Sequence, residues 1–430
     1  MNLVHGELIV SPQERDALLD TLEEAIMDTL EKGTLNTAIV LNACDALSQA
    51  IGEEHIELLE SVGIPHEKAI EYVWEAKFRL QRDSLLKRLE SELGDMFSLE
   101  GRLSTTRENG LWVKERIMPL GVLLHIAAGN QYGLAFFSVI EGLLTGNINL
   151  VKLPSEDDGL SSFILMELIK TEPRLKEYIY LFDYTSKEKW AIGRLMKAAD
   201  AVVVWGGDQA IKAARIMANP NTKIIEWGHK LSFAYISQSG IQANMLKGLA
   251  DHIVKTNQLL CSSCQGIYLD TDSMYDIYSF CERFLPVLEQ SQKEHSVEIP
   301  VEVQAQTGLL VYTESLKTHD RPCTVFRGGQ NSLLAYEDSS LEATIPYGNC
   351  WVKRLPRERI LGVLRPYKNH LQTAGLLCPE EERPELSNLL WNAGLVRVTK
   401  GANMSEGYNG EAHDGEYTLR RYTRIVAQYE

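Results

Sequence analysis

The stretch GVLLHIAAGN at residues 121–130 begins the part of the chain that decides the fold. Its apolar first half predicts a buried strand, and the small residues that follow predict a tight turn. A helix is expected over 134–144, followed by a second strand, INLVK, at 148–152. Two strands joined by a helix in this way indicate a βαβ unit with parallel pairing.

The same alternation continues beyond this unit. Further strands are expected at 179–182, 201–205 and 223–225, with helices near 161–170, 187–198 and 209–217. This spacing predicts a doubly wound parallel sheet, which binds its ligands at the carboxyl ends of the strands. Residues 11–99 show apolar positions at helical spacing, and Ser11-Pro12 is a plausible cap and first turn. A second α/β block is expected from Cys261 to about residue 392, followed by a polar, glycine-rich tail with a strand-like run at 423–427.

Composition excludes several classes of function. The hydrophobic content of 44% and charged content of 24% are ordinary for a soluble globular chain of 430 residues. A net charge of −16 argues against nucleic-acid binding. No apolar run approaches the roughly 18 residues of a membrane span, and the N-terminus lacks a secretory pattern. Seven scattered cysteines do not suggest a disulfide framework, so we expect a reducing, cytoplasmic location.

The segment TNQLLCSSCQG at 256–266 contains the best candidate nucleophile. Cys261 stands among small polar residues just before the strand-like GIYL at 266–269, and a thiol held on a turn can attack a carbonyl carbon. Most cysteines are instead small buried hydrophobes. Cys261 and Cys264 also form a CxxC pair, which raises zinc binding or thiol–disulfide exchange. We expect neither, because no second ligand pair follows and redox CxxC pairs open a helix rather than a strand.

Two positions at expected strand ends are suited to a nucleotide. Gly206-Gly207 lies between a strand and a helix, where backbone N–H groups can hold a pyrophosphate. The alternative is a plain turn with Asp208 as the helix N-cap. Lys152 ends a strand and can reach a ribose hydroxyl or a ribose 2′-phosphate, although a surface lysine would look the same.

Two further positions carry groups of use in acyl chemistry. The Asn130 amide could stabilise a developing oxyanion, although Gly-Asn is also an ordinary turn. Glu226 follows Ile224-Ile225, and a carboxyl in such an apolar setting should be hard to ionise and could move protons. A carboxylate that only hydrogen-bonds the backbone is the alternative for Glu226.

In order and spacing these motifs resemble the aldehyde dehydrogenase superfamily. Gly129-Asn130, Gly146-Asn147 and the run 150–156 look like its cofactor segment, and EWGHK at 226–230 looks like its Glu-Leu-Gly-Gly-Lys block. The gap of 35 residues from Glu226 to Cys261 matches the family's glutamate-to-cysteine spacing. The chain is most similar to the acyl-CoA reductase branch typified by the bioluminescence fatty acyl reductase (LuxC). The motifs that indicate this branch are QLLCSSCQ at 258–265, WGGD at 205–208 and HDG at 413–415.

The resemblance implies an aldehyde dehydrogenase-like α/β fold, with a doubly wound cofactor domain and a smaller α/β catalytic domain. We expect a helical N-terminal region at 1–115, a dinucleotide-binding domain at 116–256, a catalytic domain at 257–395 and an oligomerisation tail at 396–430. Ser155 and Glu156 would join Lys152 in binding the cofactor. The chain departs from the family at three points. Gly206-Gly207 replaces Gly-Ser-Thr, Leu153 is an extra residue, and the Glu-x-Phe-Gly-Pro segment is absent.

The implied activity is reduction of an acyl thioester to an aldehyde. Cys261 would carry the acyl group, Asn130 and the Cys261 N–H would hold the oxyanion, and Glu226 would assist protonation or tune the thiol. The cofactor would be NADPH, with NADH as the alternative, and no metal is expected. The donor would be acyl-CoA or an acyl-protein, with an acyltransferase or acyl-protein synthetase as partner, and the chain would form homo-oligomers. The alternatives are an aldehyde-oxidising dehydrogenase and a non-catalytic scaffold subunit.

Overall fold

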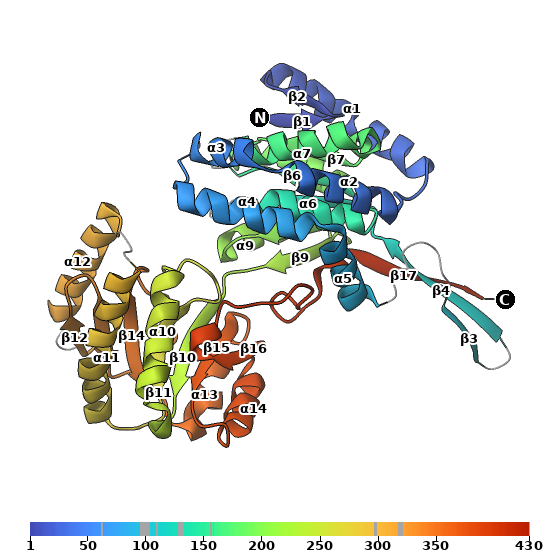
Figure 1. The fold of residues 1–430 in the computed structure, drawn as a ribbon. Helices are drawn as coiled ribbons and strands as arrows, with labels where there is room; N and C mark the ends of the chain where they lie inside the picture. The colour runs from blue at the N-terminus through green and yellow to red at the C-terminus, as the bar shows by residue number, and fades with distance from the viewer. Residues whose placement is uncertain are drawn as a thin grey trace. The chain divides into compact units, whose positions relative to one another are not determined.

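The computed structural model describes residues 1–61, 63–94, 104–108, 111–127, 133–154, 157, 159–295, 299–316 and 321–429. The chain folds into two compact units, described separately below (Figure 1). The first unit contains Met1–Gly228 and Tyr408–Glu430, and the second contains His229–Gly407. Among the described residues, no helix has both the length and the apolar character needed to cross a membrane.

The first unit is built on a mixed sheet with the order β2-β1-β7-β6-β5-β8-β9 in the described residues. Its parallel strands are β5 (Val122–Ile126), β6 (Ile148–Lys152), β7 (Ile179–Phe182), β8 (Ala201–Trp205) and β9 (Lys223–Trp227). These strands confirm the expected βαβ alternation. An antiparallel hairpin, β1 (Asn2–Val4) and β2 (Glu7–Ile9), extends the sheet beside β7. The sequence did not predict this hairpin, because strands of three residues are too short to show a period.

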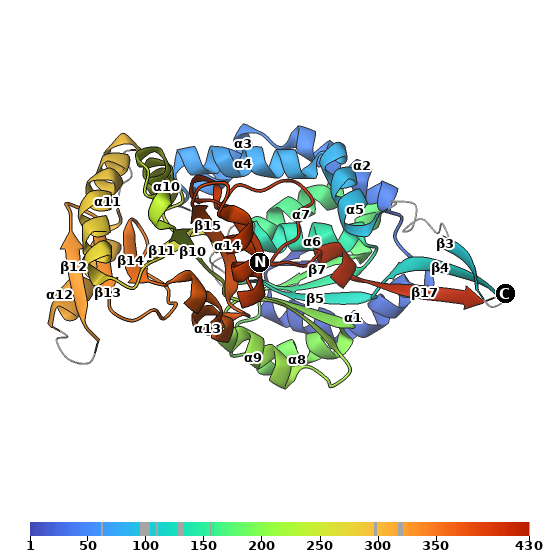
Figure 2. The same ribbon diagram turned by 90° about the horizontal axis from the view of Figure 1, so that it is seen from below.

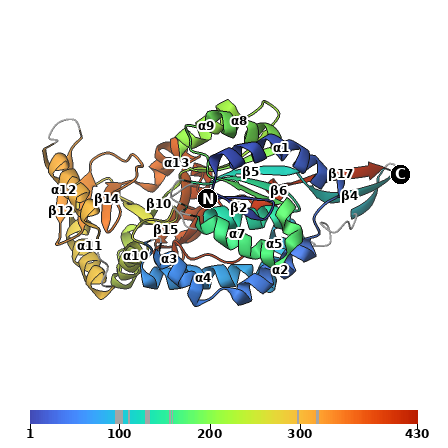
Figure 3. The same cartoon turned by 90° about the horizontal axis from the view of Figure 1, so that it is seen from above.

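Helices cover both faces of this sheet. One face packs against α6 (Leu134–Leu144) and α7 (Leu160–Thr171), and the helices that extend this core are α2 (Thr37–Ala50), α3 (Glu53–Ser61), α4 (His66–Leu80) and α5 (Arg82–Leu93). The other face packs against α1 (Pro12–Glu31), α8 (Lys189–Ala198) and α9 (Asp208–Met217). Figures 2 and 3 show α4 and α8 on opposite sides of the sheet. The N-terminal helices therefore belong to the first unit. Ser11 caps α1, as expected, by accepting a hydrogen bond from the Glu14 N–H.

The second unit contains another sheet, with the order β12-β13-β14-β11-β10-β15-β16 in the described residues. Its parallel strands are β10 (Leu231–Ile236), β11 (Cys264–Leu269), β13 (Ser332–Tyr336), β14 (Asn349–Arg354), β15 (Leu371–Leu377) and β16 (Arg397–Lys400). Strand β12 (Cys323–Arg327) joins β13 antiparallel. One face packs against α10 (Ala243–Lys255) and α11 (Met274–Glu294), and the other against α13 (Ile360–Leu364) and α14 (Arg383–Ala393). Helix α12 (Val301–Leu316) lies next to β12.

The boundary between the units differs from the expected one at 256. Strand β10 pairs with β11 and β15, and Leu249 and Ile253 of α10 are buried in the core of the second unit. Residues from His229 onward therefore belong to the unit that carries Cys261. Sheet pairing between distant segments sets this boundary, and the local sequence pattern does not reveal it.

The expected tail at 396–430 is divided in the same way. Strand β16 stays in the second unit, whereas the chain from Tyr408 returns to the first. There α15 (Thr418–Arg421) leads into β17 (Thr423–Tyr429), which pairs antiparallel with β4 (Leu111–Pro119). Strand β3 (Ser104–Glu108) completes this small sheet on the other side of β4. The predicted C-terminal strand is confirmed, and within this chain its partner is β4.

Candidate active site

Cys261 lies in the second unit, on a turn between α10 and β11. The chain reverses direction after α10 through two residues with positive φ, Asn257 (+49°) and Gln258 (+60°). Cys261 is exposed, as are the neighbouring side chains of Leu259 and Leu260. The side-chain amide of Gln372 donates a hydrogen bond from Nε2 to the Cys261 sulfur over 3.2 Å. The thiol is therefore both accessible and held from one side, as a nucleophile requires.

Gln258 anchors the beginning of this loop to β11 and β14. Its buried Nε2 lies 2.8 Å from the Cys264 carbonyl oxygen, 2.9 Å from that of Asn349 and 3.3 Å from the Cys350 sulfur. Its Oε1 accepts a hydrogen bond of 2.8 Å from the Gly348 N–H. A buried amide with both ends engaged fixes the backbone around it, because breaking these bonds would leave polar groups unpaired.

Ser232 links the loop to the strand that carries Gln372. The Ser232 hydroxyl donates to the Cys261 carbonyl oxygen over 2.7 Å and accepts from the Thr373 N–H over 3.1 Å. The register of β10 shifts near Ser232 against both β11 and β15. Such an irregularity changes the direction of a side chain relative to a regular strand. Here the Ser232 hydroxyl reaches both the Cys261 carbonyl oxygen and the Thr373 N–H.

Cys264 has a different environment from Cys261. It is fully buried at the start of β11, and its thiol donates to the Gly266 carbonyl oxygen over 3.2 Å. Burial raises the pKa of the Cys264 thiol to about 12. The Cys264 thiolate is therefore scarce at neutral pH, and Cys261 is the better nucleophile of the CxxC pair.

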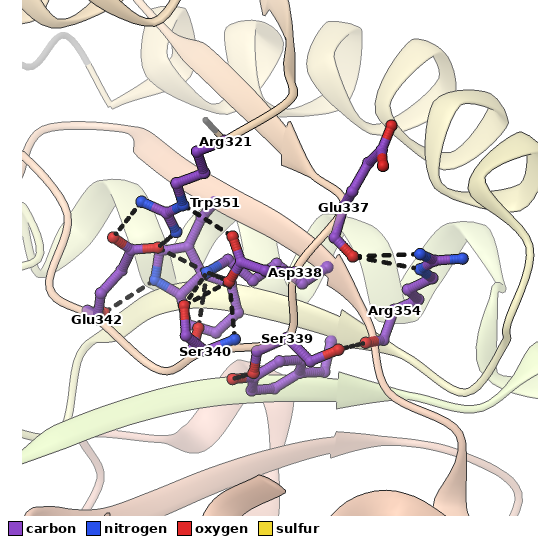
Figure 4. A network of polar contacts seen from close by, with 10 residues as sticks. Arg321, Glu337, Asp338, Ser339, Ser340, Glu342, Trp351 and Arg354 are labelled. Carbon is purple, nitrogen blue, oxygen red and sulfur yellow. Dashed lines mark hydrogen bonds and ion pairs between the residues drawn. The ribbon is translucent and has the colours of Figure 1, made fainter. Parts of the chain in front are cut away.

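A polar cluster lies at the start of a segment, residues 338–347, that contacts the nucleophile region. Figure 4 shows Arg321 paired with Asp338 and Glu342, which also bind the fully buried Lys353 amine at 3.0 Å and 2.6 Å. Through its backbone N–H groups, this segment contacts residues 256–266, here called the nucleophile loop. The Thr344 N–H donates to the Gln265 side chain, and the Tyr347 N–H donates to the Asn257 carbonyl oxygen. The sequence did not predict this cluster, because its members are separated in the chain by other elements.

The first unit contains the positions expected to bind a cofactor. The order β7-β6-β5-β8-β9 places a topological switch point between β5 and β8, where ligands bind doubly wound sheets. Gly206-Gly207 follows β8 at this edge, and Lys152 ends β6 at the same edge. Gly207, rather than Asp208, is the N-cap of α9, and no side chain caps the helix. Asn130, Ser155 and Glu156 lie outside the described residues.

Glu226 does not have the apolar setting expected from Ile224-Ile225. The side chain is only partly buried on β9, and the Arg215 guanidinium of α9 binds both of its carboxylate oxygens, with 2.7 Å between Nη2 and Oε2. The expected apolar setting is therefore wrong, because a guanidinium lies against the carboxylate. The local sequence shows only the two isoleucines, whereas α9 brings the guanidinium across from another element.

Aromatic side chains gather at the carboxyl ends of β8 and β9. The rings of Trp205 and Trp227 stack with centroids 5.4 Å apart, and the His413 ring lies 5.4 Å from the first and 4.9 Å from the second. The Arg421 guanidinium lies over Trp227. In the sequence, the HDG motif at 413–415 indicates the family branch and has no assigned role. Its histidine lies at the carboxyl ends of β8 and β9 in the first unit.

The family model of the LuxC acyl-CoA reductases matches residues 34–425 of this chain. The chain belongs to this family. It is therefore an enzyme of the acyl reductase class, which confirms the class expected from the sequence. Similar proteins include the long-chain acyl-protein thioester reductase of Aliivibrio fischeri, 23% identical over 389 residues, with 86% of this chain and 76% of the relative covered. The protein of the same name from Photobacterium phosphoreum is 27% identical over 390 residues, covering 86% and 75%.

Solved structures with the same fold are aldehyde dehydrogenases. A putative aldehyde dehydrogenase from Anabaena variabilis superposes with a TM-score of 0.71 at 15% identity, covering 98% of this chain and 94% of its own. The NADP-dependent glyceraldehyde-3-phosphate dehydrogenase of Bacillus halodurans, solved in complex with NADP, gives a TM-score of 0.73 at 13% identity, covering 100% and 98%. The expected aldehyde dehydrogenase-like fold is thereby confirmed.

Proposed function

We propose that this chain reduces a long-chain acyl thioester to the aldehyde with a nicotinamide cofactor, through an acyl group carried on Cys261. The observation that carries the proposal is the exposed Cys261 sulfur, which accepts a hydrogen bond from an amide while its loop is anchored by Gln258 and Ser232. Family membership supports the reaction class.

The chemistry assigned to Cys261 has two stages. The thiolate attacks the thioester carbonyl carbon, a new C–S bond forms, and the original thiol leaves with its electron pair and takes up a proton. A reduced nicotinamide, when bound, supplies hydride to the acyl carbon. The bond from that carbon to the Cys261 sulfur then breaks, which releases the aldehyde and restores the thiolate. The Cys261 N–H and the Asn130 amide would stabilise the oxyanion in both stages.

The first unit would hold the cofactor. Only Gly206 and Gly207 separate the end of β8 from helix α9, which has no side-chain cap, and this arrangement suits a pyrophosphate at the two glycines. Lys152 ends β6 at the same edge and would pair with a ribose 2′-phosphate, so we favour NADPH over NADH. Ser155 and Glu156 follow in sequence and would contact the ribose. Glu226 would assist protonation.

The names of the relatives guide the choice of substrate. The proteins from Aliivibrio fischeri and Photobacterium phosphoreum are named long-chain acyl-protein thioester reductases. We therefore propose a long-chain acyl donor, presented as an acyl-protein by a transferase or synthetase partner or as acyl-CoA.

We also propose that the chain works as a homo-oligomer. Within the described residues, β17 pairs with β4 along one edge only, and its other edge has no partner strand.

Mass spectrometry after exposure to a long-chain acyl-CoA tests the proposal. The wild type and a Cys264→Ala control should both gain one acyl group on the peptide containing Cys261, and NADPH should then remove that group and release the aldehyde. Cys261→Ala should remain unmodified and inactive. A folded Cys261→Ala variant that still becomes acylated and still forms aldehyde would refute the assignment. Acid formation from aldehyde and NADP⁺ without CoA would instead support the aldehyde-oxidising alternative.

A further inference from the structure

The Gln372 side chain lies against the Cys261 sulfur. It lies on β15, is 7% exposed, and its Nε2 donates to Sγ over 3.2 Å although the two residues are 111 positions apart in the chain. Its backbone is held as well, since the Val396 N–H donates to the Gln372 carbonyl oxygen over 3.2 Å. The donor is therefore fixed by a buried strand and does not come from a flexible surface side chain.

We propose that Gln372 is a catalytic residue whose amide N–H stabilises the Cys261 thiolate, both as the attacking nucleophile and as the group released with the aldehyde. The inference rests on the proposed function of Cys261 and adds a residue to it. A hydrogen bond to the charged form of a group favours that form. An amide donates N–H at every pH and cannot remove a proton, so Gln372 would stabilise the thiolate without acting as its base.

The same contact serves both stages of the reaction. In acylation the negative charge leaves the sulfur as the C–S bond to the acyl carbon forms and the thiol of the substrate departs. In reduction the hydride joins the acyl carbon, the C–S bond breaks, and the electron pair of that bond returns to the sulfur. The sulfur therefore carries full negative charge before the first stage and after the second, and it is within reach of the Gln372 N–H on each occasion.

Ser232 connects the two segments that carry this pair. Its hydroxyl binds the Cys261 carbonyl oxygen and the N–H of Thr373, the residue next to Gln372. One side chain thus ties the loop carrying the sulfur to the strand carrying the donor. Because both contacts are at backbone atoms, loss of the hydroxyl would loosen the geometry without removing the donor itself.

The test measures the rate of Cys261 alkylation by iodoacetamide against pH in the absence of substrate and cofactor, with modification located by peptide mass spectrometry. Gln372→Met keeps the length of the side chain and removes the donor. Its alkylation midpoint should rise by about one to two pH units, as expected for a hydrogen bond to a charged group. Gln372→Glu should raise the midpoint further, because it places a carboxylate beside the thiolate. Ser262→Ala is the matched control, since the Ser262 hydroxyl binds the Ser405 hydroxyl, and its midpoint should remain that of the wild type.

The outcomes separate this proposal from the proposed function. Inactivity of Cys261→Ala together with an unchanged midpoint in folded Gln372→Met and Gln372→Glu would overturn the role of Gln372 alone. Activity retained in Cys261→Ala would overturn the function itself. Protection of the buried Cys264 from alkylation serves as the folding check for each variant, and Gln372→Asn, which shortens the reach of the donor, provides a second test if Gln372→Met does not fold. An intermediate midpoint in Gln372→Asn supports the proposal, and a wild-type midpoint refutes it.

Discussion

Replacement of Gln258 by methionine should destabilise the second unit and leave the first unchanged. Methionine matches the length of glutamine and occupies the same backbone conformation, so the substitution removes polar atoms with little change in volume. The Gly348 N–H then loses its acceptor, and the Cys264 and Asn349 carbonyl oxygens lose a donor. All of these groups are in or beside the nucleophile loop.

The size of the effect follows from these lost contacts. An orphaned buried N–H costs about 1–3 kcal/mol, and a carbonyl oxygen, which has a second lone pair, costs less. Together the three groups should lower the free energy of unfolding of the second unit by roughly 4 kcal/mol. With a denaturant dependence of ~2–3 kcal/mol per molar urea, the unfolding midpoint should fall by about 1–2 M.

Buried cysteines provide an assay that distinguishes the two units. Cys264 and Cys350 are buried in the second unit and Cys44 in the first, so each becomes alkylatable only when its own unit opens. Short pulses of N-ethylmaleimide at increasing urea, read by peptide mass spectrometry, give a midpoint for each thiol. In Gln258→Met the midpoints of Cys264 and Cys350 should fall and that of Cys44 should not.

Gln265→Met is the control for this experiment. The Gln265 amide also bonds within the loop, to the Gln258 carbonyl oxygen and from the Thr344 N–H, but it is only partly buried. Its loss should shift the midpoint by less than about 0.5 M, since water can replace its partners. Equal shifts in the two variants, or an unchanged Cys350 midpoint in Gln258→Met, would refute the assignment of the loop anchor to Gln258.

Further predictions concern the polar cluster around Asp338 and the carboxyl edge of the sheet in the first unit. Burial opposes ionisation of Asp338, but hydrogen bonds from Arg321, Ser340 and Lys353 outweigh it and lower its pKa. The Asp338 carboxylate therefore contributes to stability above the pKa of ~3.9 that it has in the unfolded chain, and this contribution is lost as the pH falls toward its lower pKa in the folded chain. The difference in Tm between the wild type and Asp338→Asn should accordingly shrink from pH 7 to pH 3. A difference that grows would contradict this. Lys152→Ala should weaken NADPH binding by roughly tenfold, as expected for a lost charge-assisted bond, and NADH binding much less, as measured by calorimetry. NADPH should also quench the emission of Trp205 and Trp227, and a variant with phenylalanine at both positions should lose most of this change. Undiminished quenching would place the cofactor elsewhere.

The sequence alone was enough to predict the parallel strands and helices from residue 121 to 227 and the turn that carries Cys261. Buried strands are short apolar runs, helices repeat every three to four residues, and small polar residues mark the turn, so these features are local patterns. Only the tertiary structure decided which groups meet Cys261 and Glu226. Gln372 and Ser232 reach Cys261 from β15 and β10, and Arg215 reaches Glu226 from α9. Hydrogen bonds between elements far apart in the chain depend on strand order and register, which leave no periodic signal in the sequence.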